Sequence, residues 1–238
     1  MDNKKLIAGF GYQEGRISSW DGKRTYTQAV PQMAKHCCDN GVDEILVYDW
    51  SVTDEDHEAA IAVIKEVCRE ADAPVIAGGR VKRMEDVKKY LYAGASAVFL
   101  DMSKEENTDM IKEASGRFGK EKIYAYLPTD EYIDSVKDYE AAGASVMLLN
   151  TAGSVPSLLE MASISDSEAS FLFFLQAKDD AKDTAESLKN AFGCGNICGA
   201  VLTFTEDNMD SSMTIKQSLK AAGISVDTFE SSVDWKDF

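Results

Sequence analysis

A phrase that recurs about every fifty residues constrains this chain more than any other feature. In each copy a glycine ends a helical pattern and is followed by a short small or polar stretch and then an apolar run. The glycines are Gly41, Gly94, Gly143 and Gly199, at intervals of 53, 49 and 56 residues. A glycine suits a helix C-terminus, where the backbone needs a positive φ before it enters a strand. Each copy therefore predicts the passage from a helix into a strand.

Eight apolar runs in all have the length of strands. Four follow the repeated glycines, at 42–48, 95–100, 144–149 and 200–204, and four lie between them, at 6–10, 74–78, 123–127 and 170–175. The runs are continuously apolar rather than alternating, as expected of strands that are buried on both faces of a parallel sheet. One interval between repeated glycines therefore contains two strand–helix units.

Helical patterns separate the runs. One begins at the capping sequence 53–56 (Thr-Asp-Glu-Asp) and continues with apolar residues at helical spacing over 60–68. Strands that alternate with helices imply a parallel sheet, and eight such units in a chain near the usual ~250 residues imply a closed (βα)8 TIM barrel of the α/β class. The alternative is an open doubly wound sheet, but 11–15 (Gly-Tyr-Gln-Glu-Gly) does not match its glycine-rich first turn. We assign residues 1–226 to the barrel, with a poorly marked sixth helix in 154–167.

Composition limits the classes of partner. The chain has 25 basic and 41 acidic residues and a net charge of −16. This excess of acid disfavours binding to nucleic acid and to anionic membrane surfaces, because both need clustered lysine and arginine. No run approaches the roughly 20 apolar residues of a membrane span. Five cysteines, an odd number, do not suggest a disulfide framework. We therefore expect a cytoplasmic protein that binds neither nucleic acid nor membrane.

In a barrel of this kind the chemistry lies at the carboxyl ends of the strands. Two aspartates stand there, Asp49 and Asp101, and each is either a candidate catalytic acid or base or a carboxylate that fixes a loop. A paired-carboxylate mechanism would need the two to face each other across the mouth. Where the third strand ends, Gly78 and Gly79 offer backbone N–H groups to a phosphate and Arg80 adds charge, or the three residues form only a tight turn.

The other reactive side chains carry weaker signals. His36 and His57 lie in helical segments rather than at strand ends, so we expect structural or exposed roles for both. Cys194 and Cys198 would need two further ligands nearby to hold zinc, so a loop between helix and strand is the better interpretation. Lys178 follows the seventh strand, and we expect it at the surface. The sequence implies no metal and no other cofactor.

Five stretches of the sequence resemble the same protein family. They are 41–49, 74–81, 85–87, 93–95 and 14–17 (Glu-Gly-Arg-Ile). They resemble the histidine-biosynthesis barrels, which are the cyclase subunit of imidazole glycerol phosphate synthase and phosphoribosylformimino-aminoimidazole carboxamide ribotide isomerase. The last stretch is similar to the Asp-Gly-Arg-Val of the family's first loop. The resemblance is good over about 5–105 and alignable to about 226. It implies the TIM-barrel fold and, as the ligand of Gly78, Gly79 and Arg80, a phosphosugar or ribotide.

The departures from that family concern its catalytic residues. The family has a catalytic aspartate at the end of the first strand, where this chain has Gly11, and another at the end of the fifth, where it has Leu127. Asp130 does not align with the second one. The family's second phosphate loop, Ser-Gly-Gly, corresponds here to 176–178 (Gln-Ala-Lys). Loss of one acid–base group typically costs 10²–10⁴ in rate. We therefore expect a barrel that has kept the fold and lost the reaction.

The end of the chain carries a second resemblance. Residues 233–238 (Val-Asp-Trp-Lys-Asp-Phe) are similar to the opening of phosphoribosyl-AMP cyclohydrolase domains. We therefore interpret 227–238 as a linker into a following cyclohydrolase, and then a phosphoribosyl-ATP pyrophosphatase, in one multifunctional chain. Three functions stay open: a non-catalytic scaffold or interaction domain, which we favour; a sensor that binds a phosphosugar at 78–80; and an enzyme that has reassigned catalysis to Asp49 and Asp101.

Overall fold

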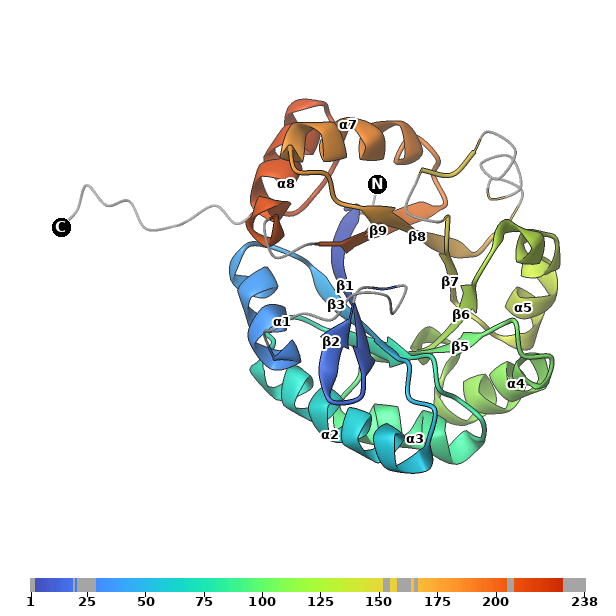
Figure 1. The fold of residues 1–238 in the computed structure, drawn as a ribbon. Helices are drawn as coiled ribbons and strands as arrows, with labels where there is room; N and C mark the ends of the chain where they lie inside the picture. The colour runs from blue at the N-terminus through green and yellow to red at the C-terminus, as the bar shows by residue number, and fades with distance from the viewer. Residues whose placement is uncertain are drawn as a thin grey trace.

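The chain folds into a closed barrel of eight parallel strands surrounded by a ring of helices (Figure 1). The computed structural model describes residues 3–18, 20, 29–151, 155–157, 164, 167–204 and 208–228. The strands follow one another in chain order around the barrel, and the last, β9, pairs with the first, β1, to close the sheet. The predicted TIM barrel is confirmed, and the open doubly wound sheet is wrong.

Each of the eight predicted apolar runs is a barrel strand. The strands are β1 (Lys5–Gln13), β3 (Glu44–Asp49), β4 (Val75–Gly78), β5 (Ala97–Asp101), β6 (Ile123–Leu127), β7 (Val146–Leu149), β8 (Ser170–Gln176) and β9 (Ile197–Thr203). The strand pattern does not predict the short β2 (Arg16–Ser18), which pairs antiparallel with the end of β1. This hairpin turns at Glu14 and Gly15, and both have the positive φ that a two-residue type I′ turn requires.

The helices cover the outer face of the sheet (Figure 1). They are α1 (Val30–Asp39), α2 (Asp54–Glu70), α3 (Met84–Ala93), α4 (Glu106–Phe118), α5 (Val136–Ala142), α7 (Ala181–Ala191) and α8 (Ser212–Ala221). The Thr53 hydroxyl accepts a hydrogen bond from the backbone N–H of Asp56, which confirms the predicted capped start of α2. Most of the predicted sixth helix and all of 229–238 lie outside the described residues. Within the described residues, no helix is long and apolar enough to cross a membrane.

Three of the four repeated glycines have the predicted conformation. Gly41, Gly94 and Gly143 have φ angles of 91°, 111° and 112°, in the left-handed region that favours glycine. Gly199 differs, because it lies inside β9, where a Cβ would come within 2.5 Å of the Lys5 carbonyl oxygen on β1. The glycine here allows two strands to approach closely, and it does not end a helix. The predicted helix end at Gly199 is therefore wrong.

Apolar side chains form two concentric layers. The outer layer lies between the strands and the helices and draws on both. The inner layer fills the barrel with aliphatic side chains from seven strands and with aromatic side chains; the aliphatic ones are Ile7, Leu46, Ile76, Ala97, Leu148, Leu172 and Val201. Successive strand residues point to opposite faces, so a shift of one residue decides whether a side chain reaches the barrel mouth or the helices.

Candidate functional site at the barrel mouth

Asp49, the last residue of β3, points away from the barrel axis. Its neighbour Tyr48 belongs to the inner layer, so the Asp49 carboxylate lies between the sheet and the helices, where it is buried. Oδ1 accepts a hydrogen bond from the Ser51 backbone N–H (2.9 Å), and Oδ2 accepts from the Tyr90 hydroxyl (2.8 Å) and from His57 Nδ1 (2.6 Å). The carboxylate therefore ties β3 to α2 and α3.

His57, for which the sequence predicts a structural or exposed role, is a buried member of this network. It lies in the first turn of α2, and its side chain is 1% exposed. The ring lies between two carboxylates, with Nδ1 2.6 Å from Asp49 and Nε2 3.6 Å from Asp86 of α3. Nε2 is buried and has no hydrogen-bond partner within the part of the chain that the structure describes. The available signal was helical spacing, which places His57 on the same face as the buried Ala60 and Ile64.

The three residues predicted to bind phosphate span the end of β4 and the turn after it, with Gly78 as the last residue of the strand. Gly79 has a φ of 104°, and a Cβ there would lie 2.5 Å from the Tyr48 ring. The buried Arg80 side chain forms an ion pair with Asp54 in the first turn of α2, and this pairing holds the pKa of Asp54 below its usual value. The Arg80 guanidinium is thus already paired with a carboxylate, and the turn joins β4 to α2.

Asp101, at the end of β5, faces the barrel mouth. Its Oδ2 accepts a hydrogen bond from the Tyr48 hydroxyl (3.3 Å), and its Oδ1 accepts one from the Ser103 backbone N–H (2.9 Å). Burial, and then the charge of Asp101, raise the pKa of Tyr48 far above its ordinary value. Asp101 and Asp49 lie in different layers, one in the mouth and one behind the sheet, so they do not face each other as a pair.

The two positions matched to the family's catalytic aspartates bring no carboxylate to the mouth. Gly11 lies on β1 and pairs with Ser18 in the β1–β2 hairpin. Leu127 is fully buried in the outer layer, and the preceding residue, Tyr126, is the one that faces the barrel interior. Asp130 is exposed beyond the end of β6. At these two positions, β1 and β6 therefore present no carboxylate.

Aromatic side chains fill the mouth instead. Five buried rings gather there, and they are Trp20, Tyr48, Phe99, Tyr126 and Phe174. The centroid of the Trp20 indole lies 4.2 Å from that of Phe174, 5.0 Å from that of Tyr48 and 5.8 Å from that of Tyr126. The indole N–H donates to the Tyr126 hydroxyl (3.4 Å). Sequence reasoning missed this cluster because its members are distant in the chain, and only the strand register brings them together.

The other candidates lie away from the mouth. Lys178 is exposed and bonds to α7, and the exposed His36 forms an ion pair with Asp210. Cys198 lies within β9 rather than in the predicted connecting loop, because the strand begins before it, at Ile197. Across residues 3–228, in the ranges that the structure describes, no three His, Cys, Asp or Glu side chains are grouped to hold a metal ion.

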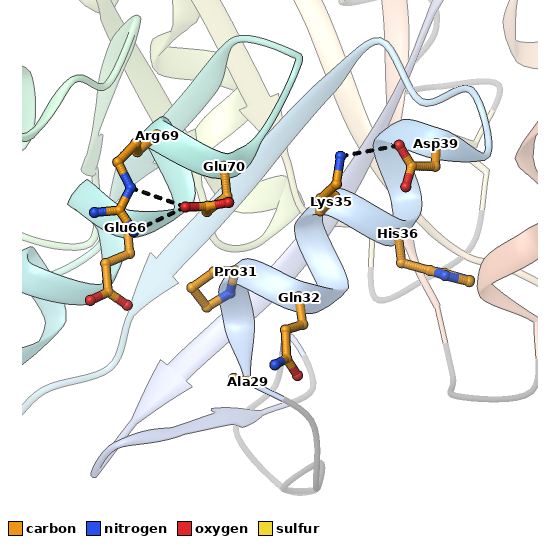
Figure 2. Close-up of a pocket in the computed structure, with 9 residues that line it drawn as sticks. All are labelled: Ala29, Pro31, Gln32, Lys35, His36, Asp39, Glu66, Arg69 and Glu70. Atoms are coloured by element: carbon orange, nitrogen blue, oxygen red, sulfur yellow. Dashed lines mark hydrogen bonds and ion pairs between the residues drawn. The ribbon is translucent and has the colours of Figure 1, made fainter.

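A pocket of about 560 Å³ lies on the outside of the helix ring, between α1 and α2 (Figure 2). Four of its charged side chains form two pairs, Lys35 with Asp39 and Arg69 with Glu70. These pairs are exposed to solvent, and the pocket lies away from the strand ends. It therefore lacks the converging polar groups of a catalytic site.

Comparison with known proteins places this barrel in a family. The family model described as histidine biosynthesis protein matches residues 14–141, which is more than half of the chain. This chain belongs to the histidine biosynthesis protein family. The match extends from the β1–β2 hairpin into α5 and includes the strand ends at Asp49, 78–80, Asp101 and Leu127.

Similar curated proteins include the imidazole glycerol phosphate synthase subunit HisF of Staphylococcus aureus strains Newman, USA300 and COL. Each is 29% identical over 137 residues, which cover 56% of this chain and 53% of the relative. The chain thus spans about half the length of the curated relatives it matches. The likeness supports a HisF-like member of the histidine biosynthesis family.

Burial makes two thiols of this histidine-biosynthesis barrel hard to ionise. It raises the pKa of Cys37 to about 12 and that of Cys198 to about 11. Because the thiolate is the reactive form, we expect both cysteines to resist a disulfide reagent such as 5,5′-dithiobis(2-nitrobenzoate) at about pH 8 and to react once the chain is unfolded in guanidinium chloride. Mass spectrometry of labelled peptides would identify the sites, and rapid labelling of native Cys37 would contradict the burial.

Proposed function

We propose that this chain is a histidine-biosynthesis barrel that has lost its reaction and serves as a scaffold or interaction domain for another enzyme of the same pathway. The observation that carries the proposal is the Trp20 indole, which lies among Tyr48, Phe99, Tyr126 and Phe174 in the barrel mouth. A small-molecule site needs a concave space with a few converging polar groups. Here aromatic side chains take that space.

The acid–base groups support the same proposal. The resemblance implies one catalytic aspartate on the first strand and one on the fifth, but the corresponding positions hold Gly11 and Leu127. Of the remaining candidates, Asp101 accepts hydrogen bonds from Tyr48 and from backbone, and Asp49 is used behind the sheet. Without two carboxylates across the mouth, the barrel is left without the proton transfers of a cyclase or a ribotide isomerase.

The partner that we propose is a cyclohydrolase domain that follows in the same cytoplasmic chain, with a pyrophosphatase beyond it. The support is the resemblance of 233–238 to the opening of phosphoribosyl-AMP cyclohydrolase domains, next to a barrel of the histidine biosynthesis family. Reading the gene past Phe238 tests the proposal directly. We expect a following domain with clustered cysteine, histidine and acidic residues, whereas an immediate stop codon would remove this partner.

The activity test uses the purified chain and a variant with the mouth emptied. We expect wild type to form no imidazole glycerol phosphate and to isomerise no ribotide above the uncatalysed rate. Trp20→Ala should be equally inactive, since the space that it creates brings no carboxylate. If Trp20 only blocks an intact active site, Trp20→Ala should gain activity. If the mouth lacks catalytic groups, the variant stays inactive. Turnover by wild type would overturn the proposal, and its loss in Asp101→Asn would assign the reaction to Asp101.

A phosphosugar sensor is the second candidate, favoured by a buried atom at the end of β4. The Nε of Arg80 is buried and has no hydrogen-bond partner within the described residues, and Arg80 directly follows Gly79, whose φ is 104°. A ligand that binds only the native state raises its stability by RT ln(1 + [L]/Kd), or about 2.7 kcal/mol at a hundred times Kd. A melting temperature that millimolar ribose 5-phosphate leaves unchanged would count against this function.

A further inference from the structure

We infer that the barrel mouth contains a binding site for a flat aromatic ring that carries an N–H donor, and that Trp20 occupies this site from within the chain. The walls, which we call the aromatic box, are Tyr48, Phe99, Tyr126 and Phe174. The inference goes beyond the proposed function, which needs only that the mouth be filled and lack catalysts. It says what kind of molecule competes for that space.

The walls of the aromatic box are held in place without Trp20. They come from four barrel strands, β3, β5, β6 and β8, whose backbones are fixed by parallel pairing. The Tyr48 hydroxyl donates to Asp101, and the Tyr126 hydroxyl accepts from Asn150 Nδ2 (3.0 Å). A site whose side chains are locked by packing and by outer hydrogen bonds keeps its geometry when the occupant changes. The box is therefore built before a ring enters it.

Two glycines lie at inward positions of the barrel close to the box. Gly9 on β1 and Gly78 on β4 follow the inward-facing Ile7 and Ile76 by two residues, so both lie at inward positions. A Cβ on Gly9 would lie 2.6 Å from Val201 Cγ1 and 3.7 Å from Cε3 of the indole. The indole thus lies beside a strand position that has no side chain.

The chemistry of the box selects a neutral aromatic ring. The indole meets Tyr48 edge-on at 90°, an arrangement that aromatic quadrupoles favour, and packs on Phe174 with a tilt of 33°. Its N–H is directed at the Tyr126 hydroxyl, a neutral acceptor. Asp101 accepts a hydrogen bond from the Tyr48 hydroxyl, which places a negative charge beside the box. The walls therefore suit indole-like or other neutral nitrogen heteroaromatic rings rather than a charged sugar phosphate.

Trp20 differs from the walls in how it is held. It belongs to no barrel strand, because it lies beyond the end of β2. Its carbonyl oxygen accepts a hydrogen bond from Trp50 Nε1 (3.1 Å), and its side chain is held by the box. A free ring must displace this side chain, so the apparent affinity of wild type is lowered by the fraction of molecules in which the box is open.

The test measures binding of free indole by isothermal titration calorimetry. We expect Trp20→Ala to bind one indole per chain at least tenfold more tightly than wild type does. Benzothiophene, which has the same shape but no N–H, should bind the variant several-fold more weakly than indole, and the double variant Trp20→Ala, Tyr126→Phe should bind both probes alike. Equal affinity of wild type and Trp20→Ala for indole would place the binding elsewhere and overturn the inference.

The folded state of the variant decides how a negative result is interpreted. If Trp20→Ala keeps its near-UV circular dichroism but binds no indole, the box is ordinary core that collapses when emptied, and the inference fails. If Trp20→Ala is unfolded, indole should restore the native far-UV spectrum and raise the melting temperature, as a native-state ligand does. Failure of that rescue also overturns the inference, and neither outcome bears on whether wild type is catalytically inactive.

Discussion

Replacing Lys216 with alanine is expected to lower the free energy of unfolding by about 3–5 kcal/mol, the cost of removing one partner from a buried ion pair. Lys216 lies on α8 with no exposed side-chain surface, and its Nζ bonds to Asp43 Oδ1 (2.5 Å). The other oxygen of Asp43 accepts the Leu6 backbone N–H of β1 (2.7 Å). The variant therefore leaves a largely buried carboxylate without its cation, at the point where the last helix meets the first strand. Urea unfolding followed by circular dichroism measures the loss.

Two control variants make this expectation specific to the buried pair. Lys35→Ala removes an exposed lysine that contacts Asp39 (3.5 Å) and Asp72 (3.6 Å), and the urea midpoint should change little, because solvent screens exposed pairs. The double variant Lys216→Met, Asp43→Asn removes both buried charges and should recover part of the lost stability. Equal losses for Lys216→Ala and Lys35→Ala would show that burial of the pair does not set its energy.

The fold could be predicted because its signals are local. Each strand is one apolar run, and several helix ends that precede a strand are marked by a glycine such as Gly94, whose φ of 111° excludes most side chains. Gly199 shows the limit of that reasoning. It has the same sequence context, but its constraint is a strand 194 residues away, where the Lys5 carbonyl leaves no room for a Cβ. A single-sequence pattern does not distinguish a glycine required by φ from one required by a distant neighbour.

The candidate site was predictable only in part, for a similar reason. The sequence places Asp49 and Asp101 at strand ends, and both are there. Whether each side chain faces the mouth or the helices depends on register to within one residue, and register is set by pairing across the whole barrel. The partners of Asp49 lie on two helices, and the indole of Trp20 meets rings from four strands. Such contacts are set by the closed sheet, which no single segment encodes.

Replacing Asp49 with alanine is expected to lower the free energy of unfolding about as much as Lys216→Ala does. The effect comes from lost contacts in the fold rather than from lost catalysis. The substitution leaves three donors without their acceptor: the Ser51 backbone N–H, the Tyr90 hydroxyl and His57 Nδ1. A buried donor left unsatisfied costs about 1–3 kcal/mol, so the free energy of unfolding should fall by about 3–5 kcal/mol once the three groups partly relax. Equilibrium urea unfolding gives the value, and hydrogen exchange should show early opening of α2 and α3.

Asp101→Ala is the matched control, because it removes the same side chain from the end of another strand. Asp101 accepts one hydrogen bond from the Tyr48 hydroxyl, at 3.3 Å, and one from the Ser103 backbone N–H. It is 8% exposed, so water is close enough to take its place, and the loss should stay within about 1–2 kcal/mol. Asp49→Asn should fall between the two alanine variants, since its amide oxygen still accepts from one or two of the three donors. If Asp49→Ala proves no less stable than Asp101→Ala, the Asp49 carboxylate does not hold β3 to α2 and α3, and a role at the barrel mouth would have to be reconsidered.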